Sequence, residues 1–261
     1  MNLIKSFLTK NDCYQNNVKR IDSRYKTFQD KGATGLMLHS VGCEQPSAKV
    51  FINTWNKPAS QQGGRQTCVH AFVEANGDVY QTMPWNYRGW HGGGKSNDTY
   101  IGVEMTEPDT IKYEKNSSKW TDLDPTKTKA HVLGTYKASV ELFATLCQEL
   151  KLDPLRDGVV ISHSEGYKRG IASNSADVEH IWSKFGLTMN QFRKDVSEKM
   201  KPGNNIVPPA SPIPHNENWA QEHLDNLVGK GIIQTPDAWK DFKSNVTKEM
   251  LLALIDKMSN K

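Results

Sequence analysis

Long apolar runs are missing from this sequence of 261 residues. No stretch approaches the roughly 18 uninterrupted apolar residues that a membrane-spanning helix needs, so we expect no membrane insertion. The opening residues lack the cleavage pattern of a secretory signal, and we expect the protein to be made in the cytoplasm without a signal peptide. Hydrophobic residues make up 36% of the chain and charged residues 24%, proportions that are typical of a soluble globular protein.

Cysteine is scarce, and charge of one sign is not concentrated anywhere. The four cysteines, Cys13, Cys43, Cys68 and Cys147, form no CxxC pair, so we expect free thiols in a reducing compartment. The net charge of +4 is mild, and basic residues are mixed with acidic ones rather than forming a stripe. This distribution argues against a nucleic-acid-binding protein, although it favours approach to an anionic polymer.

Proline is concentrated in one segment, residues 201–218, where five prolines stand among small and polar residues. Such a composition favours an extended course and predicts a semi-rigid linker. The linker separates a domain of residues 1–200 from a small helical unit of residues 219–261. Because this unit is close to the size at which a single core is marginal, we hypothesise that two copies pair as a homodimer.

Before the linker, short apolar runs alternate with helical patterns. Asn76-Gly77-Asp78 predicts a tight hairpin, because Asn and Gly tolerate positive φ. Asp124 followed by Pro125 is a typical start for a long helix. A hairpin combined with helical crossovers indicates an α/β domain, with a mixed central sheet flanked by helices, followed by the small all-α unit. We predict strands at residues 35–40, 68–75, 79–84, 100–107 and 158–164, and helices at residues 46–56, 125–150 and 189–200.

Two histidines, His39 and His163, stand at the ends of predicted strands. The carboxyl ends of strands in an α/β sheet open into the crevice where ligands bind, so the two side chains can converge. Asp177 follows in a loop of small residues that can fold back beneath His163. Two histidines, one carboxylate and an open fourth position form a typical hydrolytic zinc site. Each histidine can equally be a hydrogen-bonded polar group at a strand end, and the residues alone leave both interpretations open.

The segment VHAFVEANGDVYQTMPWNYRGWHGGGKSNDTYIGVEM, residues 69–105, resembles the central signature of the type 2 N-acetylmuramoyl-L-alanine amidases, which share a fold with peptidoglycan recognition proteins. In that family a strand that ends in histidine precedes the block, and a second histidine-bearing strand with a metal-bearing loop follows it. This chain has LMLHS, the block, the long helix and ISHSEG in the same order. The ordered occurrence over roughly residues 20–200 is more specific than any single motif.

The resemblance implies a zinc ion (Zn2+) held by His39, His163 and Asp177. Asp177 follows His163 by 14 residues, more than is usual in the family, so Glu179 and His180 are alternative third ligands.

The resemblance also implies that Glu104 faces the metal, where a carboxylate can take a proton and pass it to the leaving amine. By strand alternation Ile101, Val103 and Met105 share one face, and Glu104 points with Gly102 toward a cleft or solvent.

Further site residues follow from the same resemblance. Ser175 stands two residues before the third ligand, where its hydroxyl can donate to a developing oxyanion. Tyr80 matches a tyrosine that steadies the tetrahedral intermediate in some members, or is a half-buried strand aromatic. His70, Trp90 and His91 lie on family positions and are expected to support or line the substrate site. Residues 107–127 form either a groove wall or a surface loop.

Beyond the linker, residues 219–233 and 246–258 resemble S-layer homology modules, which attach proteins to cell-wall polymers. The segments HSEGYKRGIAS and ADVEHIW are most similar in sequence to amidases carried by prophages of Gram-positive bacteria. Together the resemblances imply a zinc-dependent amidase that cuts the bond between N-acetylmuramic acid and L-alanine in peptidoglycan. We expect an endolysin that reaches the cell wall after release.

Two alternatives remain at this point. One is a non-catalytic peptidoglycan-binding protein, against which the complete set of ligand residues argues. The other is a cytoplasmic amidase that recycles muropeptides. The linker and the extra unit argue against it, because small soluble fragments need no anchor.

Overall fold

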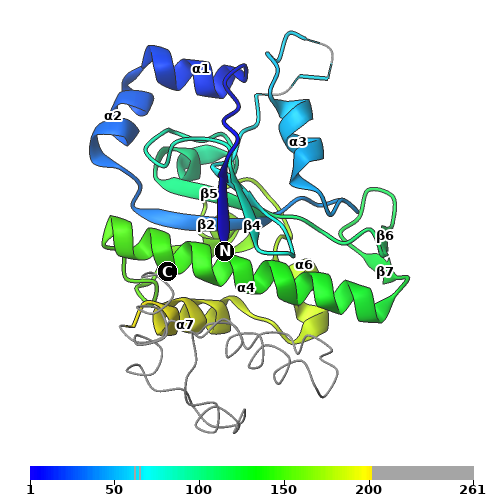
Figure 1. The fold of residues 1–261 in the computed structure, drawn as a ribbon. Coiled ribbons are helices and arrows are strands. Elements are labelled where there is room, and N and C mark those ends of the chain that lie inside the picture. Colours follow the sequence, from blue (N-terminus) through cyan, green and yellow to red (C-terminus); the bar gives the residue numbers. More distant parts are fainter. Residues whose placement is uncertain (62, 65, 202–261) are drawn as a thin grey trace, which may run out of the picture. The chain divides into compact units, whose positions relative to one another are not determined.

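A six-stranded sheet lies at the centre of the part of the chain that the computed structural model describes, residues 1–61, 63–64 and 66–201 (Figure 1). Nearly all of the expected linker and the whole expected helical unit lie outside these residues. The binding of a wall polymer and the pairing of two copies were expected of that helical unit, so both stay predictions. The strands are β1 (Asn2–Lys5), β2 (Gly35–Ser40), β3 (Ala71–Val73), β4 (Asp78–Gln81), β5 (Tyr100–Met105), β6 (Ile111–Tyr113), β7 (Trp120–Asp122) and β8 (Val160–Ser162). The helices are α1 (Asp12–Lys19), α2 (Ser23–Lys31), α3 (Ala48–Trp55), α4 (Pro125–Leu150), α5 (His163–Lys168), α6 (Glu179–Trp182) and α7 (Met189–Lys199), with 3-10 turns η1 (Gly94–Asp98) and η2 (Ser183–Phe185).

The central sheet is mixed, as the sequence predicted. Its strands lie in the order β1-β4-β3-β5-β2-β8. Neighbouring strands are parallel except β3 and β4, which form the hairpin expected at Asn76-Gly77-Asp78. Gly77 has a φ of 92°, which glycine adopts at little cost, and the Asp78 amide donates to Asn76 Oδ1 at 2.9 Å. Every strand predicted for this domain is present, and β2 has the predicted bounds.

Helix α4 covers one face of the sheet, and α7 packs beside it (Figure 1). Asp124 caps α4 by accepting from the Lys127 amide, and Pro125 is in its first turn, as predicted. Although α4 has 26 residues, neither it nor any other described helix is apolar enough to span a membrane. The core on this face includes Leu36 and Leu38 of β2, Ile101 and Val103 of β5, Val132, Phe143 and Cys147 of α4, and Phe192 and Val196 of α7.

A second, smaller core lies on the opposite face of the sheet. It joins α1 and α3 to the sheet through buried residues that include Cys13, Ala48, Trp55, Phe72 and Tyr80. We did not predict β1, α1 or α2, because these elements are short and polar, and their local periodicity is weak.

The cysteines contradict the expectation of four free thiols. Cys13 and Cys68 are joined in a disulfide, with their Cα atoms 6.5 Å apart, and both are buried. They are 55 residues apart in sequence, so no spacing motif marks the pair. Cys147 is a free cysteine, as expected, and burial raises the pKa of its thiol to about 12.

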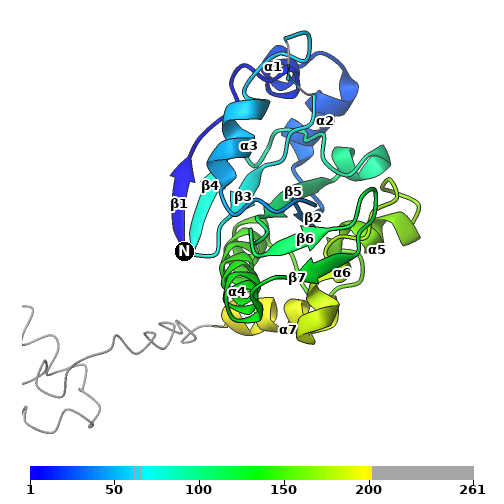
Figure 2. The ribbon, with the colours of Figure 1, turned by 90° about the vertical axis from the view of Figure 1, so that its right-hand side faces the viewer.

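The segment of residues 107–127 contains the antiparallel hairpin of β6 and β7. Figure 2 shows this hairpin beside α6. The Trp120 indole donates to the carbonyl oxygen of His180 at 3.1 Å, and the Lys184 ammonium donates to the carbonyl oxygen of Trp120 at 2.7 Å. The hairpin is therefore held against the chain that follows Asp177, which favours the groove wall over the surface loop.

Candidate metal centre and its cleft

Three of the predicted ligands meet at the carboxyl ends of the parallel strands. His39 lies in β2, His163 begins α5 directly after β8, and Asp177 lies in the loop before α6. The Nδ1 atoms of the two histidines are 3.0 Å apart, and Asp177 Oδ2 is 3.4 Å from the His39 Nδ1 and 3.5 Å from the His163 Nδ1. Ligand bonds of about 2.0–2.1 Å in a tetrahedron place donor atoms roughly 3.3 Å apart. The three atoms therefore have a spacing that fits a zinc ion.

The loop that carries Asp177 is fixed against the start of α5. The Ser162 hydroxyl accepts from the Glu165 amide, and the Glu165 carboxylate accepts from the Ser162 amide, which completes a capping box. The Ser164 amide donates to the carbonyl oxygen of Asp177 at 2.9 Å. The strand predicted at residues 158–164 therefore ends earlier, at Ser162, and His163 is presented from the first turn of a helix.

The three candidate ligands are buried, and the protonation states of Asp177 and His39 suit the binding of a cation. Burial alone would raise the pKa of Asp177, but hydrogen bonds with His163 and His39 hold that pKa below its usual range. Burial lowers the pKa of His39 against the opposing effect of Asp177. The centre therefore offers an ionised carboxylate and a neutral imidazole, which are the forms that bind a metal.

Glu104 lies beside this centre, because it is the register partner of His39 in the parallel pair of β5 and β2. Its Oε2 atom is buried and has no hydrogen-bond partner among the residues that the structure describes. Burial, together with the charges of Asp177 and Glu107, raises the pKa of Glu104 well above its usual value. A carboxyl group that can hold a proton closer to neutral pH is suited to proton transfer.

The open space that we expected above Gly102 is filled by the ring of His91. A Cβ atom added at Gly102 would lie 2.4 Å from His91 Cγ. His91 Nδ1 is 3.0 Å from His39 Nε2. His91 therefore adjoins the candidate metal centre through His39, one of its three candidate ligands.

His70 and Trp90, the other predicted substrate groups, are not among the side chains whose donor atoms meet at this site. His70 has no exposed surface. Its Nε2 donates to the carbonyl oxygen of Tyr87 at 2.7 Å, and its Nδ1 accepts from the Gly102 amide at 3.0 Å. Neither ring nitrogen is left for a substrate, so of the two expected roles for His70 the structure favours the supporting one. Trp90 is 40% exposed, and its ring lies 5.7 Å from the Arg88 guanidinium.

Tyr80 is not brought to the metal centre either. It is 6% exposed and belongs to the core beneath α3. In the sheet register Phe72 lies between Tyr80 and Glu104. The alternative interpretation, a strand aromatic, is the one that the structure favours.

An open cleft of about 550 Å³ borders Asp177. The turn of the β6–β7 hairpin lines the cleft, and so does the loop that leads to Asp177. Ser175 is among the lining residues, and its hydroxyl oxygen is 3.5 Å from the Asp177 amide nitrogen. The lining residues are Gly42, Tyr113, Asn116, Ser117, Ser118, Asn174, Ser175, Ala176, Asp177 and His180.

Both alternative third ligands have other partners. His180 Nε2 is 2.6 Å from the Tyr113 hydroxyl and 3.4 Å from Glu107 Oε1, and the Tyr113 hydroxyl donates to Glu107 Oε2 at 2.7 Å. Glu179 Oε1 accepts from the Ser162 hydroxyl at 2.6 Å. Asp177 is therefore the third side chain that the structure brings to His39 and His163. The sequence analysis missed Tyr113 and Glu107, because no motif links a hairpin residue to a strand end.

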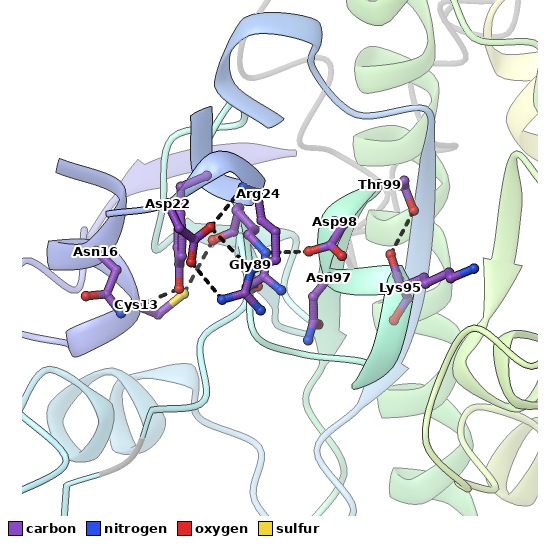
Figure 3. A network of polar contacts seen from close by, with 12 residues as sticks. Cys13, Asn16, Asp22, Arg24, Gly89, Lys95, Asn97, Asp98 and Thr99 are labelled. Atoms are coloured by element: carbon purple, nitrogen blue, oxygen red, sulfur yellow. Dashed lines mark hydrogen bonds and ion pairs between the residues drawn. The ribbon is translucent and has the colours of Figure 1, made fainter. Parts of the chain in front are cut away.

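The segment between β4 and β5 is braced by two polar contacts. Arg88 Nε donates to Asp98 Oδ1 at 2.6 Å. Asn97 Oδ1 accepts from the amides of His91 and Gly92, at 2.9 Å and 3.0 Å. Figure 3 shows Asn97 and Asp98 next to each other in this segment. The backbone of His91 is thus fixed close to the candidate metal ligand His39.

Comparisons with known proteins place these features in a family. A family model described as N-acetylmuramoyl-L-alanine amidase matches residues 29–179, a range that includes the three ligands and Glu104. No curated protein sequence matches the chain. The structure of the hydrolase AmiA from Staphylococcus aureus, in complex with its ligand, is similar over 64% of this chain and 73% of that chain, with 21% identity and a TM-score of 0.49.

Two further solved structures are similar. The PlyG catalytic domain is 13% identical over 77% of this chain and 96% of that chain, with a TM-score of 0.48. A mutant endolysin from Bacillus subtilis is 15% identical over 75% of this chain and 99% of that chain, with a TM-score of 0.44.

Proposed function

Because the chain belongs to the N-acetylmuramoyl-L-alanine amidase family, we propose that it is a zinc-dependent enzyme that hydrolyses the amide bond between N-acetylmuramic acid and L-alanine in peptidoglycan. The observation that carries the proposal is the spacing of three buried donor atoms, from His39, His163 and Asp177, at distances suited to a tetrahedral ion. A zinc ion held there would supply Lewis-acid polarisation of the amide carbonyl.

Glu104 carries the proton in this proposal. Its carboxylate takes a proton from the water whose oxygen attacks the carbonyl carbon. It then returns that proton to the alanine nitrogen as the carbon–nitrogen bond breaks. The raised pKa and the unpartnered Oε2 support this role, because the group can hold a proton and none of the described residues hydrogen-bonds to that oxygen.

The cleft beside Asp177 holds the substrate in this proposal. Ser175 lines the cleft two residues before Asp177, and its hydroxyl can donate to the oxyanion that develops on the carbonyl oxygen. The turn of the β6–β7 hairpin adds Asn116, Ser117 and Ser118, which are neutral hydrogen-bonding side chains. Such groups suit the hydroxyl, acetamido and peptide groups that flank the scissile bond.

The proposed biological role, that of an endolysin, rests on the sequence that follows the amidase domain. A proline-rich segment, residues 201–218, and a unit similar to S-layer homology modules, residues 219–261, suit an endolysin that grips a wall polymer while it cuts. An enzyme that recycles small soluble fragments needs no such unit. The complete donor set argues against a non-catalytic binding protein.

Zinc analysis combined with a wall-digestion assay tests the proposal. The full chain is expected to hold about one zinc ion and to release new alanine amino termini from purified cell walls. Chelation should remove both properties, and added zinc should restore them. Zinc-loaded protein that releases no alanine amino termini would contradict the proposed function.

A further inference from the structure

Each ring nitrogen of His91 faces a group of this chain. His91 Nδ1 is 3.0 Å from His39 Nε2, and His91 Nε2 is 3.1 Å from the carbonyl oxygen of Tyr100. His39 turns its other nitrogen, Nδ1, toward His163 and Asp177. His91 therefore contacts His39 on the side that faces away from the metal centre.

His39, His91 and the Tyr100 carbonyl group form a series of hydrogen-bonded groups. The positions of its hydrogens follow from the two groups at its ends. The carbonyl oxygen of Tyr100 can only accept, so His91 Nε2 carries a hydrogen. A neutral imidazole has one N–H and one lone pair, so His91 Nδ1 accepts and His39 Nε2 donates. The lone pair of His39 is then on Nδ1. Metal binding makes the same demand from the other end, because a ligand nitrogen must be unprotonated.

The space around His91 fits an imidazole ring closely. A Cβ atom at Gly102 would lie 2.4 Å from His91 Cγ, and one at Gly89 would lie 2.6 Å from His91 Cδ2. A side chain at either glycine would displace the ring. The rings of His91 and His39 meet edge-on, with centroids 5.1 Å apart and an interplanar angle of 79°. Together with the Asn97 contact to the His91 amide, these packing limits fix where the ring lies.

We propose that His91 is a positioning residue of the metal centre: it accepts the Nε2 hydrogen of His39 and thereby selects the ring orientation and tautomer in which His39 Nδ1 binds the metal. The carbonyl group of Tyr100, at the start of β5, fixes the tautomer of His91 and so forms the fixed end of this hydrogen-bond relay. The inference rests on the proposed zinc site, but it does not depend on which bond the enzyme cuts. Of the supporting and substrate-lining roles that the sequence suggested for His91, it specifies the supporting one.

Zinc affinity, measured by competition with a chromogenic chelator, tests the relay. His91→Leu keeps side-chain bulk without an acceptor and is expected to bind zinc about 10–100-fold more weakly. His91→Asn places an amide oxygen near the position of Nδ1 and should recover most of that loss. His131→Leu is the matched control, because His131 Nε2 bonds the carbonyl oxygen of Thr106 at 3.0 Å and does not contact a ligand. Its zinc affinity should match that of the wild type.

A second measurement does not depend on how the variants fold. Ring-nitrogen NMR of the zinc-loaded wild-type protein should place the hydrogens of His39 and His91 on Nε2 in both rings. A His39 hydrogen on Nδ1 would overturn the inference. So would wild-type affinity in His91→Leu, or equal losses in the Leu and Asn variants. Zinc-loaded protein with the expected tautomers but no amidase activity would refute the proposed function and leave this relay intact.

Discussion

The two faces of strands β2 and β5 differ in what they bury. On the face toward α4, Leu38 and Val103 have no exposed surface and pack among apolar side chains. On the opposite face, the next residues along the same strands are His39 and Glu104, and one oxygen of Glu104 is buried without a hydrogen-bond partner in the described part of the chain. Apolar burial stabilises the fold, whereas burial of an unpaired polar group costs stability. The comparison shows that ionisable side chains gather on the face that the proposed metal site occupies, whereas the face toward α4 is mainly apolar.

Removing a ligand from the polar face should have the largest effect. Asp177→Ala is expected to lose zinc and to reduce amidase activity to background, because two histidines alone do not complete a hydrolytic zinc site. His180→Ala should keep most of both, because His180 is bonded to Tyr113 and Glu107 instead. Zinc analysis and release of alanine amino termini measure both variants. The opposite pattern would assign the third ligand to His180.

Glu104→Gln separates function from stability on the same face. Activity should fall by about 10²–10⁴-fold, because an amide cannot accept the proton. The metal-free variant should melt at a higher temperature than the wild type near pH 7. The reason is that the pKa of Glu104 is raised on folding, so its ionised form opposes folding above the unfolded pKa of about 4.3. Calorimetry of the metal-free proteins checks this, and a lower melting temperature for the variant would count against the buried-charge argument.

Phe143→Ala tests the apolar face. Phe143 has no exposed surface and lies 5.1 Å, ring to ring, from Phe192. We expect the free energy of unfolding to fall by about 3–5 kcal/mol, through lost burial and a cavity. Phe143→Leu should cost much less. Urea unfolding measures the loss, and the zinc affinity of the folded variant should equal that of the wild type. A large change in zinc affinity would show that the two faces are not independent.

The smallest expected effect is a pH dependence at the wall of the cleft. Burial lowers the pKa of His180, but the Glu107 carboxylate outweighs burial, so the pKa lies above its usual value. Such a histidine adds stability that is complete below about pH 6.5 and is lost as the pH rises through the folded pKa. His180→Asn should therefore lower the melting temperature by about 2–4 °C at pH 6 and by less at pH 9. An equal difference at both pH values would exclude the ion pair as its cause.

The sequence predicted what depends on local signals. The bounds of β2, the cap of α4 and the turn at Gly77 each follow from a few neighbouring residues, and all are present. His39 and His163 could be named because both stand where apolar runs stop.

Pairings between distant segments could not be predicted. Asp177 remained one of three possible ligands. Nothing in the sequence around Glu107 and Tyr113 indicates that the two residues form a hydrogen-bonded group with His180. The Cys13–Cys68 disulfide and the placement of His91 over Gly102 likewise depend on how segments far apart in the sequence pack together.

Mass spectrometry of the soluble products released from purified cell walls tests the central claim most directly. The account predicts peptides that begin with a free L-alanine amino group and glycan fragments whose N-acetylmuramic acid carries a free lactyl carboxyl group. Both products should disappear for Asp177→Ala. Fragments in which glycan and stem peptide are still joined would contradict the account.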